Sequence, residues 1–484
     1  MIDDTSKEFI SRHIGPNKSD QKEMLKAISS KSMNDLIENT VPKNILIKDN
    51  LKIDEPMSET DALKKLKLLS KNNQIFRNFI GMGYYNTVTP NVILRNILEN
   101  PGWYTSYTPY QPEVAQGRLE MLINFQQMIM DLTGMDIANA SLLDEGTAAA
   151  EAVGLCQRID KNNSKKIFVS SSCNPQTIDI IKTRVEPFNI ELIIGDEEKV
   201  LKGIKDKIIC GVLAYPGTLG EIKNPSEAIS LIHKKEGKVI MVSDLLALAR
   251  LKTPAELGAD IAVGSAQRFG IPMGYGGPHA AFFATKEEFK RSMPGRIIGV
   301  SVDRHGKKAF RLSLQTREQH IRRDKATSNI CTAQALLAII SAAYAIYHGP
   351  EGILKIANRT SKLAKIFADG LKSGGYQLHS ENFFDTVTIR TNEKTDTINN
   401  KALSEKINLR VVDKNTLSVA FDEVKRVDHV NTLLKIFGVK KMFNNADTVE
   451  LTNLPQNLLR TSKYLTHPIF NKYHSETEML RYLK

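Results

Sequence analysis

Short apolar runs alternate with helix-like stretches through the middle of the chain. The runs cover residues 167–169, 192–194, 208–213, 239–242 and 261–263. Continuous apolar runs of this length are typical of strands buried on both faces, as in parallel sheets. The stretches between them would supply the crossover helices that parallel strands need. We therefore expect a doubly wound α/β domain with a mainly parallel sheet, which a further strand at residues 281–284 extends.

The length of the chain predicts more than one domain. Its 484 residues exceed what a single hydrophobic core usually holds. Residues 333–347 predict a long apolar helix that leads into a smaller domain. We expect four parts: a helical extension over residues 1–75, a large α/β domain over 76–330, a small α+β domain over 331–448 and a junction segment over 449–484.

Composition and charge exclude several classes of protein. The chain is 41% apolar and 25% charged, which is ordinary for a globular protein. No stretch reaches the roughly 20 apolar residues of a membrane span, and the N-terminus has no apolar signal region. The net charge of +12 comes from scattered lysines without a nucleic-acid motif, and the four cysteines lack zinc spacing. We expect a cytoplasmic protein without a membrane, nucleic-acid or metal partner.

Two segments near the end of the chain repeat earlier ones. Residues 475–484, SETEMLRYLK, echo residues 58–67, SETDALKKLK. Upstream, LPQNLL at 454–459 echoes VPKNIL at 41–46. Such self-similarity at domain scale predicts a tandem duplication, of which the second copy has only begun where the chain stops. The chain would then be about half of a longer arrangement, and a chance echo of ten residues is the alternative.

A carboxylate follows the predicted strand at 239–242. Asp244 would lie at the carboxyl edge of the sheet, where α/β domains bind ligands. In pyridoxal-phosphate enzymes an Asp in this place pairs with the pyridinium nitrogen, and a later Lys holds the cofactor as a Schiff base. Gln267 stands where that Lys is expected, and Lys252 follows Asp244 too closely to replace it. An amide cannot form the linkage, and a simple loop carboxylate is the alternative reading of Asp244.

Three other segments could hold a ligand. Gly146 and Thr147 open a helix and could form an anion cradle, although small residues also suit packing of a helix on a sheet. The loop at 104–113 combines hydroxyls and aromatic rings with prolines, as a rigid binding loop or as a structural turn. Residues 317–329 combine cations with small hydroxyls before a helix, as a phosphate site or as a solvated charge run.

Together these segments resemble the glycine decarboxylase of the glycine cleavage system, the P-protein family. The resemblance runs from about residue 8 to the last residue. It rests on six stretches: 11–16 (SRHIGP), 81–85 (GMGYY), 104–113, 136–145, 274–279 (GYGGPH) and 314–332.

The resemblance implies a fold and an activity. The family has a fold-type-I pyridoxal-phosphate (PLP) transferase-like architecture with a seven-stranded type of sheet, in two fused halves or two subunits. It decarboxylates glycine, releases CO2 and passes the aminomethyl group to the lipoyl arm of H-protein. The Lys that holds PLP covalently lies in the second half. This chain resembles the first half, so no covalent cofactor is expected here, in keeping with Gln267.

The resemblance also implies roles for individual residues, none of them catalytic in this half. Thr327 and Ser328 would contact the phosphate of the PLP that the partner half holds. Four residues would line the glycine pocket: Tyr107, Thr108, Tyr110 and Gln111. Gly146, Thr147 and Asp244 would belong to a vestigial cofactor cleft.

Two interpretations from different classes remain. In the first, the chain is half of an enzyme that is active only with its partner half, in a dimer or a dimer of heterodimers. In the second, it is a non-catalytic scaffold or a truncated fragment of the fused protein. Separately encoded first subunits usually stop before a junction like residues 459–484, so this chain departs from them and looks more like a split or truncated fused protein.

Overall fold

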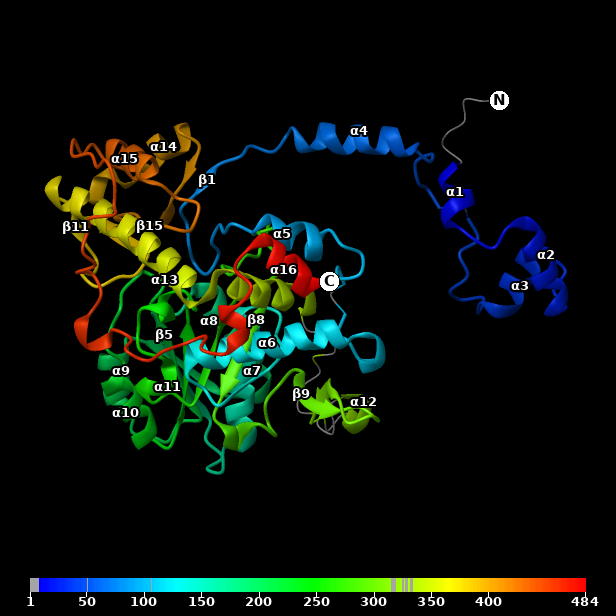
Figure 1. The fold of residues 1–484 in the computed structure, drawn as a ribbon, viewed down its shortest axis with the longest axis horizontal. Helices are drawn as coiled ribbons and strands as arrows, with labels where there is room; N and C mark the ends of the chain where they lie inside the picture. The colour runs from blue at the N-terminus through cyan, green and yellow to red at the C-terminus, as the bar shows by residue number, and fades with distance from the viewer. Residues whose placement is uncertain are drawn as a thin grey trace. The chain divides into compact units, whose positions relative to one another are not determined.

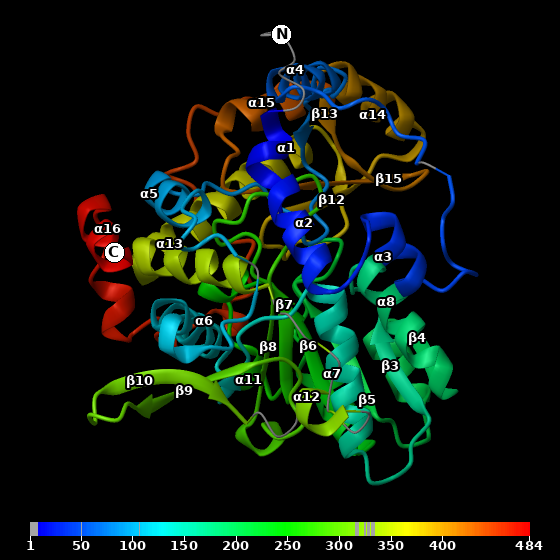
Figure 2. The same cartoon turned by 90° about the vertical axis from the view of Figure 1, so that its right-hand side faces the viewer.

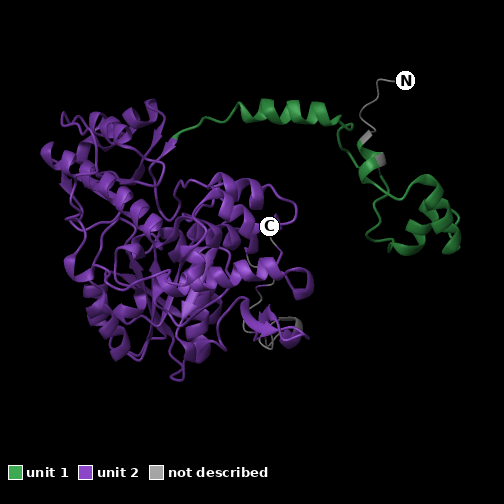
Figure 3. Ribbon diagram, in the orientation of Figure 1, with its two compact units in different colours: residues 1–76 green, residues 77–484 purple. Residues whose placement is uncertain are grey.

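A computed structural model describes residues 8–49, 51–105, 107–314, 319–323, 326, 330 and 334–484. The chain divides into two compact units, residues 1–76 and 77–484 (Figure 3). The described residues of the first unit form four helices: α1 (Glu8–His13), α2 (Lys18–Ala27), α3 (Met33–Thr40) and α4 (Glu59–Ser70). The side chains of Asn17, Ser32 and Ser58 cap α2, α3 and α4 by accepting backbone N–H groups. Among the described residues of these three helices, none is buried.

The second unit is built on a large sheet, which has seven strands within the described part of the chain. The strand order is β2-β8-β7-β6-β5-β3-β4, with parallel pairing from β7 through β4 and antiparallel pairing at β8 and β2. Each apolar run predicted as a strand lies in or overlaps one of them. The strands are β2 (Ile137–Ala138), β3 (Lys166–Ser170), β4 (Glu191–Gly195), β5 (Cys210–Tyr215), β6 (Lys238–Ser243), β7 (Ile261–Ser265) and β8 (Ala281–Thr285).

Helices cover both faces of this sheet (Figure 2). Successive strand residues alternate between two cores: Phe168 and Met241 face one, whereas Val169 and Val242 face the other. The first core is closed by α6 (Gln116–Thr133) and the start of α13 (Ala335–Ser373), the second by α7 (Glu145–Ile159) and α8 (Pro175–Val185). Burial on both faces explains why the strands are apolar throughout. The prediction of an α/β fold with a mainly parallel sheet is confirmed.

A smaller α+β domain follows on the second part of α13. The helix is interrupted at Gly349, which has a φ of 63° and stands directly before Pro350. An antiparallel sheet in the order β11-β12-β15-β14 packs with α14 (Thr395–Ser404) and α15 (Val427–Ile436) around its own core. Its strands are β11 (Gln377–Leu378), β12 (Thr386–Arg390), β14 (Arg410–Asp413) and β15 (Thr416–Ala420). Separately, β1 (Arg77–Asn78) pairs in parallel with β13 (Ile407–Asn408), so the chain enters this unit beside the small domain (Figure 1).

The remaining elements are short and surround the large sheet. The strands β9 (Ile297–Val302) and β10 (Lys308–Ser313) form an antiparallel hairpin. The helices are α5 (Asn91–Ile93), α9 (Glu197–Gly203), α10 (Ser226–Lys234), α11 (Pro254–Leu257), α12 (Gln319–Arg322) and α16 (Glu476–Leu483). No helix in the described ranges combines the length and the apolar character that a bilayer crossing requires.

The last segment of the chain packs on the large domain. Leu251 and Leu459 form an isolated β-bridge, and Lys252 N donates to Leu458 O at 2.8 Å. The guanidinium of Arg460 donates to the carbonyl oxygens of Leu132 and Leu248, both at 2.9 Å. The segment therefore belongs to the second unit and contributes to its core.

Candidate functional site

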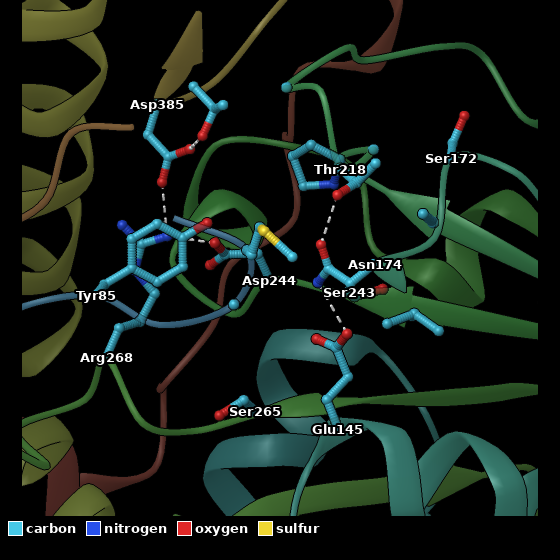
Figure 4. Close-up of a pocket in the computed structure, with 18 residues that line it drawn as sticks. Tyr85, Glu145, Ser172, Asn174, Thr218, Ser243, Asp244, Ser265, Arg268 and Asp385 are labelled. Carbon is cyan, nitrogen blue, oxygen red and sulfur yellow. Dashed lines mark hydrogen bonds and ion pairs between the residues drawn. The ribbon is translucent and has the colours of Figure 1, made fainter. Parts of the chain in front are cut away.

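A crevice opens at the carboxyl ends of the central strands (Figure 4). Ser243 ends β6, Asp244 follows it, and Ser265 ends β7. The loop at 82–85, the segments after β3 and β5, the start of α7 and the start of β12 also line it. This is the place where α/β sheets bind ligands, because the loops that leave the strands diverge there.

Arg268 lines the crevice and is itself buried. Its Nη1 donates to Asp385 Oδ2 at 2.8 Å and also to Asp244 Oδ2, as the dashed lines in Figure 4 show. The Arg268 and Asp385 side chains are 5% and 6% exposed. Burial raises the pKa of the Asp385 carboxyl, the positive charge of Arg268 opposes that rise, and the charge of Asp244 adds to it. The two carboxylates in turn raise the pKa of Arg268, so the guanidinium stays charged in spite of its burial.

Tyr85 and Gln267 close the site from the side of the 82–85 loop. The guanidinium carbon of Arg268 lies 3.8 Å from the centroid of the Tyr85 ring, a cation–π contact. The buried Gln267 side chain accepts the backbone N–H of Tyr85 at 2.9 Å and donates to the Tyr85 carbonyl at 2.7 Å. It also donates to Ile271 O at 2.7 Å. Gln267 therefore acts as a structural clamp on the loop that carries Tyr85.

A chain of hydrogen bonds crosses the other side of the crevice. Thr218 Oγ1 donates to Asn174 Oδ1 at 2.8 Å, and Asn174 Nδ2 donates to Glu145 Oε1 at 3.0 Å (Figure 4). Thr177 donates to the same Glu145 oxygen at 2.8 Å. Burial raises the pKa of Glu145, although these two hydrogen bonds act in the opposite direction. At one end, Arg410 of the small domain donates to Thr218 Oγ1 at 2.9 Å.

The crevice does not fit covalent PLP. Among the described residues that line it there is no lysine. Asp244, which would pair with a pyridinium nitrogen, already binds Arg268. At the start of α7, Asp144 Oδ1 accepts the Thr147 N–H at 2.8 Å. This carboxylate takes up a backbone donor that a phosphate at the helix N-terminus would use.

The structure brings some of the predicted site residues together and not others. Asp244 lines the crevice, Gly146 lines an adjoining hollow with His279, and Thr147 lies in the first turn of α7. The loop residues Tyr107, Thr108, Tyr110 and Gln111 line neither of them. Thr327 and Ser328 lie outside the described residues.

The predicted loop residues lie in the second unit, away from the lining of the crevice, and they differ in exposure. Tyr107 is 72% exposed and Tyr110 is 42% exposed, whereas Thr108 is buried. The Tyr110 hydroxyl accepts a hydrogen bond from Arg296 Nη2 at 2.8 Å, and the guanidinium lies 5.4 Å from the ring centroid. Arg296 is buried, and its hydrogen bond and cation–π contact hold the Tyr110 ring in place.

Sequence reasoning missed Arg268, Asp385 and Tyr85. Arg268 directly follows Gln267, so the sequence already offered a cation next to the position where a lysine was expected. Asp385 lies 117 residues from Arg268 and belongs to the small domain. No local pattern joins those two positions.

Comparison with known proteins identifies the family of this chain. The model of the family "Glycine cleavage system P-protein" matches residues 11–437. The chain belongs to this family. A glycine dehydrogenase (decarboxylating) of Pelagibacter ubique is 68% identical over 484 residues, which is all of this chain and 50% of that protein. This P-protein family member therefore spans about half the length of the curated relatives that it matches.

Solved structures show the same fold. A crystal structure of glycine decarboxylase (P-protein) of the glycine cleavage system, in inhibitor-bound form, has a TM-score of 0.80 and 31% identity. The match covers 88% of this chain and 98% of the chain in that crystal structure. A C-DES variant with glycine covalently linked to its PLP cofactor has a TM-score of 0.52 and 14% identity, over 75% of this chain and 97% of that chain. At such low identity the second likeness shows the fold alone, that of the fold-type-I PLP-dependent enzymes.

Proposed function

We propose that this P-protein family chain is one half of a glycine decarboxylase, glycine dehydrogenase (aminomethyl-transferring). With a second half it would decarboxylate glycine, release CO2 and transfer the aminomethyl group to the lipoamide arm of H-protein. The assembly would be a dimer or a dimer of heterodimers. Family membership over residues 11–437 and the half-length match to the relatives support this proposal.

The observation that carries the proposal is the crevice itself. Arg268 and its ion pairs with Asp244 and Asp385 line the crevice, the described lining includes no lysine, and Gln267 is buried against the loop that carries Tyr85. A chain of this family without a cofactor lysine in its crevice needs a partner that supplies one. PLP would then be bound covalently by the second half, where it supplies an electron sink for the electron pair left when glycine loses its carboxylate.

In this proposal, residues of this chain line part of the active site that the second half carries. Tyr107 and Tyr110 present exposed rings, and Arg296 fixes the second of them. With Thr108 and Gln111 they would line the glycine pocket. Thr327 and Ser328 would donate hydrogen bonds to the PLP phosphate, because hydroxyl groups near a helix start are suited to binding phosphate oxygens.

Reconstitution tests this function. The half of the Pelagibacter ubique relative that this chain does not match is produced separately, loaded with PLP and mixed with this chain. We expect a complex in gel filtration at micromolar concentration, and glycine–bicarbonate exchange with lipoylated H-protein that neither polypeptide shows alone. A complex without exchange activity would favour the scaffold interpretation. Failure to form a complex would contradict the proposal.

A further inference from the structure

The two copies of the repeated sequence lie in different environments. In the second copy, Leu458 and Met479 are buried at 2% and 0% exposure within the core of residues 77–484. In the first copy, the aligned Ile45 is 65% exposed. Leu66, which aligns with the buried Leu483, is 62% exposed. The same sequence pattern is thus part of the core of one unit and carries exposed apolar side chains in the other unit.

The helices of the two copies are built alike. Ser475 caps α16 by accepting the Glu478 N–H at 3.2 Å. Ser58 caps α4 by accepting the Asp61 N–H, also at 3.2 Å. The caps fix the register, so Met479 and Leu483, one turn apart on α16, correspond to Ala62 and Leu66 on α4.

The seat of α16 on the large domain is specific. The helix packs against α5, with Met479 fully buried. The Tyr482 hydroxyl donates to Glu120 Oε1 and accepts from Asn124 Nδ2, each at 3.0 Å, and both partners lie on α6. The ring of Tyr482 also stacks on Tyr473, with centroids 4.5 Å apart. Apolar burial and polar contacts together define this seat.

The α4 helix carries an apolar stripe that nothing in its unit buries. Ala62, Leu66 and Leu69 follow the spacing of one helix face. Leu66 and Leu69 are 62% and 54% exposed. Exposed apolar stripes of this kind mark interaction sites.

We propose that residues 41–49 and 51–70 belong to a docking arm that packs on a second polypeptide of the same fold, in the seat equivalent to the one that α16 fills on residues 77–484. The inference rests on the proposed function, because the partner is its second half. Each half of the assembly would then receive the arm of the other copy, as the symmetry of a duplicated chain requires. A second copy of this chain is a poorer partner, because its own α16 already occupies the seat.

Matched leucine substitutions on α4 test the arm. Leu66→Glu places a charge on the stripe, whereas Leu68→Glu places the same charge on the opposite side of the helix, where Leu68 is 63% exposed. Glu is a good helix former, so neither change breaks α4. We expect Leu66→Glu to weaken binding of the PLP-loaded second half by about 10- to 100-fold, because one leucine loses its burial. Leu68→Glu should change the dissociation constant by about 2-fold or less.

Amide hydrogen exchange supplies an independent measurement. The α4 amides of the full chain should exchange fast alone and slow down when the second half is added. If the wild-type chain binds the second half but both variants bind equally well and α4 stays unprotected, the arm is wrong and the proposed function stands. If the wild-type chain does not bind the second half, both the docking arm and the proposed function are contradicted. Protection of α4 by vesicles of anionic lipid, and not by the second half, would overturn the arm in favour of a membrane contact.

Discussion

Arg268 and Asp385 form a buried ion pair that joins the large and small domains of residues 77–484, with 2.8 Å between Nη1 and Oδ2. Arg268 follows β7 of the large sheet, and Asp385 precedes β12 of the small one. Asp244 binds the same guanidinium nitrogen from the end of β6. One cation therefore balances two carboxylates, and it links two domains at the bottom of the crevice.

Removal of this cation should destabilise the protein strongly. Arg268→Ala leaves Asp244 and Asp385 unpaired in a buried site, so we expect the free energy of unfolding to fall by about 3–5 kcal/mol. Urea unfolding measures the change. The control is Lys202→Ala, which removes an exposed ion pair with Glu227 and should cost about 1 kcal/mol or less. Equal effects of the two substitutions would contradict the role of Arg268.

The purified chain should form no Schiff base with PLP. Gln267 has no amine, and the described residues that line the crevice include no lysine. The cofactor is titrated while the imine absorbance is followed, and borohydride reduction with peptide mapping locates any fixed cofactor. A stoichiometric adduct on one lysine would show that the crevice is a working cofactor site.

Glu145 should make stability depend on pH. Burial raises its folded pKa above the ordinary value of 4.5, so above that pH the folded protein binds more protons than the unfolded chain. Its contribution is present at low pH and is lost as pH rises through the folded pKa. Glu145→Gln keeps an acceptor for Asn174 and Thr177 without the charge. We expect this variant to be more stable than wild type at pH 7, with the difference disappearing toward pH 4.

The matched control for this pH effect is Glu145→Ala. It removes the acceptor as well as the charge, so Asn174 and Thr177 lose a partner and stability should fall by about 1–3 kcal/mol at both pH values. Urea unfolding at pH 4 and pH 7 compares the three proteins. Equal pH dependence in wild type and Glu145→Gln would mean that another group titrates.

The proposed contact between Thr327 or Ser328 of this chain and the phosphate of the PLP held by the second half can be tested in the reconstituted complex. Thr327→Ala removes a hydroxyl that would bind the charged phosphate, a contact worth about 1.5–3 kcal/mol, so PLP affinity should fall roughly 10- to 150-fold while assembly survives. Thr327→Ser retains the hydroxyl and should retain most of the affinity. Unchanged affinity in both Thr327→Ala and Ser328→Ala would leave this half as a scaffold.

Much of the large domain could be predicted because its signals are local. The strands at 167–169, 239–242 and 261–263 are buried on both faces, so every position in them is apolar. Gly134, with a φ of 72°, directly follows α6, and glycine is the residue best suited to this left-handed conformation at a helix end. The position of Asp244 at the edge of the sheet follows from the strand before it.

The candidate site could be predicted only in part. Sequence position was enough to predict that Gln267 stands where a lysine is expected, because the identity of a side chain can be read without the fold. The clamp that Gln267 forms on Tyr85, 182 residues away, depends on how two loops meet. The same is true of Arg268 and Asp385, which come from different domains.

The sequence by itself determined the strands, the amide side chain at position 267 and the repeat of residues 58–67 at 475–484. Each of these depends on the order of residues along the chain, through periodicity and side-chain chemistry. Only the tertiary structure decided that Met479 is buried while Leu66 is exposed, and that Arg268 binds two carboxylates. Burial and charge pairing are set by which distant segments the folded chain brings into contact, and two helices of similar sequence therefore have different environments.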